Sequence, residues 1–321
     1  MNIEPLPDES DVLAYAGSLS NAGRWGADDE RGTLNLIGPQ ARIAAARLVT
    51  AGRTVSCAWP MDDKDAPDQV YGRMHRHMLV TGQGNGDPDA PDTADNLKRG
   101  ASEYLGLVFH GLHITHLDGL CHQFWDNRMY NGFPASEVTS YSGARRLAVT
   151  TAASGIVTRG VLLDAARSRG VPWLEPGTSV GPVELDRIAS EQGVELAAGD
   201  AVLLRTGYGA HRRTAGRMNV KEVGQSGWGA ACLPWLRDRD VALIGSDTAQ
   251  DVIPGPYQSF GHGPIHMLGI AVMGLWLLDN CDLEELSRTC AELGRWEFQF
   301  VVAPLPIVGG TGSPVNPLGI F

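Results

Sequence analysis

Residues 107–133 of this 321-residue chain read LVFHGLHITHLDGLCHQFWDNRMYNGF. Four of the nine histidines and two aspartates fall within seventeen residues of this stretch. Successive side chains of an extended backbone alternate between its two faces, so His116 and Asp118 project to the same side, about 7 Å apart along the strand. A neutral imidazole and a carboxylate are ligands suited to Zn, Mn or Fe(II). We therefore predict that His116 and Asp118 hold a divalent metal ion, with Mn or Zn expected.

The other histidines of this stretch differ in their relation to that pair. His122 lies four residues beyond Asp118 and can return to the same cavity without serving as a ligand, which makes it a candidate general base. His110 is in phase with His116 on a regular strand and is a further candidate ligand, whereas His113 is out of phase and faces away. The alternative is that all are ordinary histidines on a polar strand face. The acid in register with the imidazoles favours a metal site.

A second group of polar residues lies in the last third of the chain. The segment HGPIH, residues 262–266, opens the apolar run 267–278. On a helix that begins near Pro264, His266 sits in the first turn, beside a loop that can face the cavity. We predict His266 as a further metal ligand. Weaker candidates for contacting substrate or supporting the ligands are Gln250, His262 and Asp279, and an equally good interpretation of Asp279 is the end of a helix.

Helices and strands alternate along the chain. Predicted helices cover residues 39–49, 183–192, 230–237 and 282–293, and predicted strands cover 54–59, 155–164, 201–205, 241–245 and 295–301. Such alternation is typical of an α/β fold. We predict a single α/β domain with a central mixed or barrel-like sheet flanked by helices. Residues 82–100 are rich in Gly, Pro and Asp and are predicted to form a loop.

The first 38 residues show little helical periodicity and are predicted to form an irregular arm ahead of a domain that covers residues 39–321. The arm carries apolar side chains but little regular structure on which to bury them, so we expect it to use another surface. The apolar end, residues 318–321, has the same need. We expect both to lie at a subunit interface or across the mouth of the active site, in at least a homodimer. The alternative is an arm folded on its own subunit.

The overall charge excludes several kinds of partner. The formal net charge of -11 and the pI near 5.2 argue against nucleic acid or an anionic membrane surface, because both attract clustered Lys and Arg. The longest apolar run, residues 267–278, is too short to span a bilayer, and the acidic N-terminus lacks the features of a signal peptide. We expect a soluble, cytoplasmic protein that acts on a small molecule.

The cysteines and glycines give no second functional signature. Five widely spaced cysteines without a C-x-x-C pair are typical of reduced thiols. Cys121 adjoins His122, but adjacent strand residues point to opposite faces, which disfavours a nucleophile and base pair. The pair Gly82-x-Gly84 lacks the third glycine of a dinucleotide signature, so no nucleotide cofactor is expected.

The histidine stretch resembles the cyclase family of metal-dependent hydrolases, which includes kynurenine formamidases and isatin hydrolases and has the hallmark H-x-G-T-H-x-D-x-P-x-H. Thr115, His116, Asp118 and His122 match this pattern, and Leu112, Ile114 and Leu120 depart from it. A longer branch reads roughly H-G-x-x-x-T-H-x-D-x-L-x-H and then Y-N-G, as residues 110–122 and 130–132 do here. Other segments similar to that branch are WGADD (25–29), GTLN (32–35), RTG (205–207) and GTGSPVNP (310–317).

The resemblance implies a metal-dependent hydrolase that cleaves a C–N amide or a lactone-type C–O bond of a small cyclic or aromatic substrate. The metal would activate water, and His122 would accept its proton. Two alternatives remain open. One is a non-hydrolytic cyclase or lyase that uses the same metal, and the other is a metal-binding protein without turnover.

The departures from the family pattern bear on the number of metal ions. The position of the family's first ligand holds Leu112, for which His110 is the expected replacement. In the short kynurenine formamidases a His and, twelve residues later, a Glu hold the second metal, and counting back twelve from Asp279 reaches Met267. A slip of one residue on a helix turns a side chain by about 100°. We therefore expect one metal ion per chain.

Overall fold

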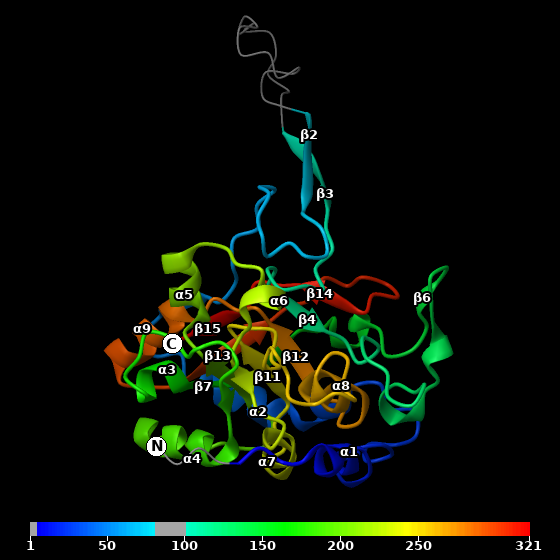
Figure 1. Ribbon diagram of the computed structural model, residues 1–321, viewed down its shortest axis with the longest axis horizontal. Coiled ribbons are helices and arrows are strands. Elements are labelled where there is room, and N and C mark those ends of the chain that lie inside the picture. Colours follow the sequence, from blue (N-terminus) through cyan, green and yellow to red (C-terminus); the bar gives the residue numbers. More distant parts are fainter. Residues whose placement is uncertain (1–4, 81–100) are drawn as a thin grey trace, which may run out of the picture.

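A nine-stranded mixed sheet forms the centre of the computed structural model, which describes residues 5–80 and 101–321 (Figure 1). Its strand order is β1-β15-β13-β7-β9-β11-β12-β4-β14, and β7, β9, β11 and β12 run parallel in the middle. The strands are β1 (Thr54–Ser56), β4 (His116–Asp118), β7 (Ile156–Asp164), β9 (Ala201–Arg205), β11 (Leu243–Ser246), β12 (Trp276–Asp279), β13 (Glu297–Val302), β14 (Gly312–Pro314) and β15 (Leu318–Ile320). The predicted single α/β domain with a central mixed sheet is confirmed.

The four parallel strands are buried on both faces. All residues of β9, β11 and β12 are buried, as expected for near-continuous apolar runs covered on both sides. Helix α2 packs on β7 and β13, and helix α8 packs on β12. The helices after the arm are α2 (Pro39–Ala46), α3 (Ala165–Ser168), α4 (Pro182–Gln192), α5 (Tyr208–Ala215), α6 (Val220–Val223), α7 (Cys232–Asp238), α8 (Pro264–Ala271) and α9 (Glu284–Leu293).

The expected helix boundaries have clear chemical causes. Pro182 opens α4, where its missing N–H costs nothing, and Gly193 ends the helix in the left-handed region at φ 66°. Gly294 ends α9 in the same way at φ 60°. The predicted alternation of helices and strands therefore holds from residue 39 onward, with boundaries shifted by a few residues.

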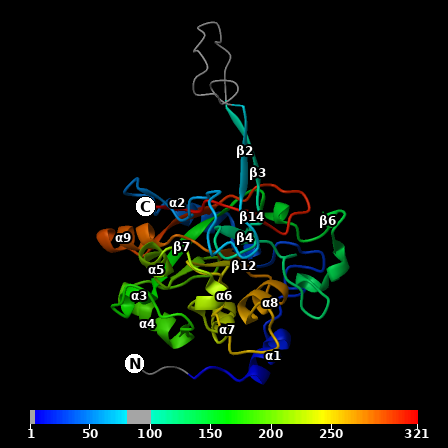
Figure 2. The same ribbon diagram turned by 45° about the horizontal axis from the view of Figure 1, so that its top comes forward.

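In the described part of the chain, three two-stranded sheets lie outside the nine-stranded sheet: β2 (His75–Val80) with β3 (Ser102–Gly106), β5 (Val138–Thr139) with β6 (Gly143–Ala144), and β8 (Ser179–Val180) with β10 (Gly227–Trp228). Strands β2 and β3 extend away from the body in both views (Figures 1 and 2). His75 and His77 lie exposed on β2 and do not line the active-site cavity described below. The loop predicted at residues 82–100 lies outside the described part of the chain.

The apolar run 267–278 is divided between two elements. Helix α8 ends at Ala271, and β12 begins at Trp276. Gly274 makes the turn with φ 65°, and a Cβ there would lie 2.5 Å from the ring of Tyr130. Interpreting Asp279 as a helix end is therefore wrong, because this residue ends a strand. The argument from a helical slip between Met267 and Asp279 fails for the same reason.

The expectation of irregular structure in residues 1–38 is wrong for two segments. Residues Glu9–Ser18 form helix α1, and Gly32–Leu36 form a 3₁₀ turn, η1. The helical signal is the spacing of Val12, Tyr15, Ala16 and Leu19, which pack as one face on the core. Helix α1 contacts α8, and η1 contacts β12 of the same chain. The apolar C-terminal end also packs inward, with Phe321 fully buried beside Phe298.

Two of the family-like segments meet where this arm crosses the body. The Tyr130 hydroxyl donates to Asp29 Oδ2 over 2.9 Å, and Gly23 N donates to Asn131 Oδ1 over 2.7 Å. The Asn131 amide in turn donates to the carbonyls of Gly26, Ala27 and Asp29. The YNG segment thus fastens the WGADD segment by side-chain bonds to its backbone. Among the described helices, none is both long and apolar enough to cross a membrane.

Candidate metal centre

The predicted site residues converge where β4 lies beside the carboxyl end of β12. Strand β4 runs antiparallel between β12 and β14, and its register places His116 opposite Asp279 and Asp118 opposite Gly312. Ligand sites of open α/β sheets lie outside the carboxyl ends of the parallel strands. Backbone pairing alone thus brings Asp279 next to His116, across 163 residues of sequence (279 minus 116).

Asp118 is the centre of the cluster. Its carboxylate is fully buried, and four imidazoles surround it. His110 Nδ1 and His116 Nε2 lie 2.9 and 3.4 Å from Oδ1, and His266 Nε2 and His122 Nε2 lie 3.6 and 3.9 Å from Oδ2. None of these contacts has the alignment of a hydrogen bond, and both oxygens lack a hydrogen-bond partner.

This arrangement fits a divalent metal ion. A buried carboxylate without hydrogen bonds is costly unless a cation satisfies it. Among the described residues, two groups of three have ligand atoms within 4.8 Å of one another: His110, Asp118 and His122, and His116, Asp118 and Asp279. His116 Nδ1 donates to the Ile114 carbonyl over 2.9 Å, which leaves the Nε2 lone pair directed at the carboxylates. Carboxylates and imidazoles of this kind suit a divalent metal ion.

His110 reaches the cluster by a different route from the predicted strand. It lies in a bend ahead of β4, so the interpretation of a regular strand back to residue 110 is wrong. Its Nε2 lies 2.9 Å from the Thr311 hydroxyl, and its ring stacks on that of His122 at 3.9 Å. A Cβ at Gly312 would lie 2.7 Å from His110 Cε1. The GTGSPVNP segment therefore shapes the seat of this imidazole.

The second half of the cluster comes from α8 and the ends of β11 and β12. His266 lies in the first turn of α8 as predicted, with Nε2 3.1 Å from Asp279 Oδ2. Gln250 donates to Asp279 Oδ1 over 2.9 Å. His262 lies apart from the carboxylates, with Nδ1 3.2 Å from Gln123 Oε1. Sequence analysis missed Asp251, whose Oδ2 accepts from His266 Nδ1 over 2.7 Å.

Burial and the neighbouring charged groups shift the pKa values of the cluster in opposite directions. Burial alone would raise the pKa of Asp118, but the neighbouring imidazoles, His122 foremost, hold that pKa well below its usual value. Burial lowers the pKa of His122 to about 4, against the attraction of Asp118. Burial also opposes the charging of His266, yet Asp279 and Asp251 raise its pKa well above the usual value. At neutral pH the carboxylate is thus ionised and His122 is neutral.

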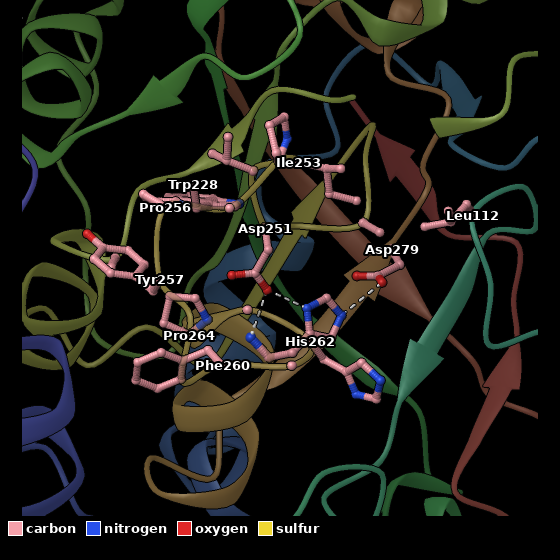
Figure 3. A pocket seen from close by; sticks show the side chains of 18 of the residues that line it. Leu112, Trp228, Asp251, Ile253, Pro256, Tyr257, Phe260, His262, Pro264 and Asp279 are labelled. Atoms are coloured by element: carbon pink, nitrogen blue, oxygen red, sulfur yellow. Dashed lines mark hydrogen bonds and ion pairs between the residues drawn. The ribbon is translucent and has the colours of Figure 1, made fainter. Parts of the chain in front are cut away.

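A cavity of about 740 Å³ opens from this cluster. Figure 3 shows Trp228, Tyr257 and Phe260 on one side of Asp251 and Asp279, with Leu112 on the opposite side. The mouth includes Leu6 of the arm, and Pro7 O accepts from the Tyr257 hydroxyl over 3.2 Å. The arm therefore reaches the cavity mouth of its own chain. The walls of the cavity are mainly apolar and suit a small, flat substrate.

Two nearby residues stay out of this chemistry. His113 is buried and does not line the cavity, as predicted, although it lies in the bend ahead of β4 and not on a regular strand. Cys121 is buried, and burial raises the pKa of its thiol to about 12. A thiol that stays protonated is a poor nucleophile. The Cys121 and His122 pair is therefore unsuited to nucleophilic catalysis.

The sequence matches a known family over most of its length. Residues 56–250 match the family model Cyclase, described as "Putative cyclase". The chain belongs to this family. A crystal structure described as that of a novel cyclase has 30% sequence identity and a TM-score of 0.82, covering 94% of this chain and 100% of that chain. A search of curated proteins found no match.

More distant structures share the fold. Isatin hydrolase A from Labrenzia aggregata bound to benzyl benzoate has 21% identity and a TM-score of 0.58, covering 83% of this chain and 92% of that chain. Isatin hydrolase A from Ralstonia solanacearum has 20% identity and a TM-score of 0.57, covering 83% and 90%. At these identities the likeness concerns the fold alone.

Proposed function

We propose that this protein is a metal-dependent hydrolase that opens a C–N amide or a lactone-type C–O bond in a small cyclic or aromatic substrate. The observation that carries the proposal is the buried Asp118 carboxylate, surrounded by four imidazoles that line a mainly apolar cavity. The isatin hydrolases that share the fold act, by their names, on isatin, which is a cyclic amide. Isatin is therefore the first compound to test.

His116 and Asp118 would hold the ion, with His110 on one side and His266 and Asp279 on the other. When bound, a divalent ion supplies a Lewis acid that polarises the substrate carbonyl and lowers the pKa of water toward neutrality. The chain itself keeps the donor atoms converged: His116 is held through Ile114 O, His110 through Thr311, and Asp279 through Gln250. Such preorganised donors do not have to rearrange during the reaction.

His122 is the proposed general base. It lines the cavity, and burial keeps its imidazole neutral at neutral pH with a pKa of about 4. It would accept a proton from the attacking water as the water oxygen bonds to the carbonyl carbon. The C–N or C–O bond then breaks, and His122 returns the proton to the leaving nitrogen or oxygen. One water is consumed, and the product is a carboxylic acid with a free amine or hydroxyl group.

The apolar wall would bind the body of the substrate. Trp228, Tyr257 and Phe260 offer flat surfaces, and aromatic pairs of this kind add about 0.5–1.5 kcal/mol beyond burial. Leu112, at the place of the family's first ligand, lines the cavity and adds an apolar contact instead of a donor. A cyclic or aromatic substrate is therefore favoured over a charged or extended one.

The test is turnover in ¹⁸O-labelled water. Protein loaded with Mn or Zn is incubated with isatin, other cyclic amides and lactones, and the masses of the products are measured by mass spectrometry. We expect one ¹⁸O atom in the new carboxylate, and formation of this product slowed by ~10²- to 10⁴-fold with His122→Ala under the same conditions. Turnover without ¹⁸O uptake would identify a non-hydrolytic cyclase or lyase. A metal-loaded protein inert toward the whole panel would contradict the hydrolase proposal.

We also propose that the protein forms at least a homodimer. The apolar side chains of the arm do not supply a reason, because the arm packs on its own chain, with α1 against α8 and η1 against β12. A different reason is the β2–β3 ribbon, where Leu79 and Tyr104 are 67% and 55% exposed. An isolated pair of strands is marginally stable in water and gains from a partner surface. Light scattering should give at least twice the 34.3 kDa chain mass, and a monomer at micromolar concentration would overturn the proposal.

A further inference from the structure

We infer that Asp251 is a positioning residue that fixes the His266 imidazole with Nε2 directed at Asp118 and Asp279, and thereby sets the metal affinity of the site. The inference rests on the proposed metal-binding role of this cluster. Asp251 belongs neither to β4 nor to either group of three donors. It lies in the segment after β11 and acts through His266.

The hydrogen bonds of Asp251 define one orientation of the ring. Oδ2 accepts from His266 Nδ1 over 2.7 Å and from the His266 backbone N–H over 3.1 Å. Oδ1 accepts from the Ile265 backbone N–H over 2.9 Å. With Nδ1 carrying a proton toward Asp251, Nε2 faces Asp279 Oδ2 at 3.1 Å and Asp118 Oδ2 at 3.6 Å. A carboxylate in this place fixes both ring orientation and tautomer.

Asp251 is itself held tightly. It is 6% exposed, and its carbonyl accepts from Gln225 Nε2 over 2.7 Å. An isolated β-bridge joins it to Trp228 of the cavity wall. Gly263, with φ 85°, packs so closely that a Cβ there would lie 2.2 Å from Asp251 Cγ. The carboxylate is therefore confined between the wall of the cavity and the start of α8.

Asp251→Asn is the informative change because asparagine keeps the shape of the side chain but cannot accept the same hydrogen bonds. Three N–H groups converge on the two oxygens of Asp251, whereas an asparagine offers one oxygen and one NH₂ group. If NH₂ faces His266, the proton must move to Nε2, which then has no lone pair for the metal. If NH₂ faces Ile265, the start of α8 loses its bond and shifts His266. Either arrangement weakens the hydrogen bonds that hold the His266 imidazole in its orientation.

The experiment titrates metal-free protein with Mn²⁺ and Zn²⁺ by calorimetry, without any substrate. We expect Asp251→Asn to weaken metal binding by ~10- to 100-fold, the range for loss of such a supporting bond. In a His266→Ala background the same change should have less than about a twofold effect. Equal losses in both backgrounds, or wild-type affinity in the single variant, would overturn the inference.

Asp247→Asn is the matched control. Asp247 is also fully buried after β11, and it accepts from the backbone N–H groups of Thr206, Gly207 and Tyr208. Its hydrogen bonds reach no imidazole, so its replacement tests general destabilisation at the same sheet edge. We expect metal affinity within about twofold of wild type. A loss as large as that of Asp251→Asn would show that any disturbance of this edge weakens the site.

A second measurement needs no variant. Nitrogen NMR of the wild-type protein, both metal-free and loaded with Zn²⁺, should show His266 with a proton on Nδ1 that exchanges slowly with water. A bare Nδ1 would overturn the inference even if Asp251→Asn fails to fold. Absence of metal binding by the wild type, with the Nδ1 proton present, would instead contradict the proposed function and leave the bond between Asp251 and His266 established.

Discussion

The two halves of the candidate metal centre are built in different ways. His116, Asp118 and His122 lie within one short segment, and strand geometry alone directs the first two to the same side. Asp251, His266 and Asp279 come from a loop, a helix and a strand, and only the folded chain brings them together. The first half is readable from spacing, whereas the second depends on turns whose position is set by distant contacts.

The largest expected effect separates these halves directly. His116→Ala and Asp118→Ala should each lose the bound metal while the fold persists, since both lie on an otherwise ordinary strand. Elemental analysis and circular dichroism measure the two properties. Full metal occupancy in either variant would contradict the assignment. His266→Ala is the matched change in the other half, and an equally complete loss there would show that the two halves contribute ligands on equal terms.

His122→Ala should leave the metal in place and reduce the catalytic rate by ~10²- to 10⁴-fold, the usual contribution of a general base. We expect the metal to stay because His122 Nε2 is the most distant of the four imidazole nitrogens from Asp118, at 3.9 Å. Metal content and single-turnover rates are measured on the same sample. Loss of the metal would make His122 a ligand with His110 and Asp118, and unchanged turnover would remove it from the mechanism.

Replacing Thr311 tests the support of His110 from the C-terminal segment. Thr311→Val removes the hydroxyl that lies 2.9 Å from His110 Nε2 and keeps the shape of the side chain. We expect a cost of about 1 kcal/mol, roughly fivefold in metal affinity. Thr311→Ser retains the hydroxyl and is the control, for which calorimetry should give nearly the wild-type affinity. Equal affinities for Val and Ser would show that His110 does not depend on this bond.

The smallest effect concerns stoichiometry, because the two groups of three donor residues share Asp118. The sequence predicted one ion because Leu112 and Met267 lack donor atoms, but His110 and His266 supply donors in their place. We still expect one ion per chain, because Asp118 and Asp279 together balance the charge of one divalent ion and a second would leave buried charge uncompensated. Elemental analysis near two ions per chain would contradict this expectation.

Much of the fold was predictable because its signals are local. Gly193 and Gly294 end their helices because each adopts the left-handed conformation that glycine favours. Buried and half-buried residues alternate along β13 because one face of this strand is buried. The run 267–278 could not be divided from sequence, since an apolar segment of that length suits a buried helix or a buried strand. The turn at Gly274 depends on the ring of Tyr130, far away in the chain.

The site was predictable to a similar degree. Spacing pointed to His116, Asp118 and His122, and the predicted helix start at Pro264 pointed to His266. The structure brings all four together. Asp251 was missed because the sequence does not show which residue after the strand 241–245 contacts the site. Gln250 bonds Asp279, and its direct neighbour Asp251 bonds His266. Helix α1 was missed although Val12, Tyr15, Ala16 and Leu19 are spaced as one face of a helix.

The bonds between Tyr130-Asn131 and residues 23–29 have an evolutionary consequence. Asn131 bonds only to backbone atoms of that segment, so substitutions in the segment are tolerated as long as its backbone path is kept. Asp29 and Tyr130 are instead joined through their side chains. Among relatives, loss of the aspartate should accompany loss of the tyrosine, and a chimaera that exchanges one segment without the other should express poorly.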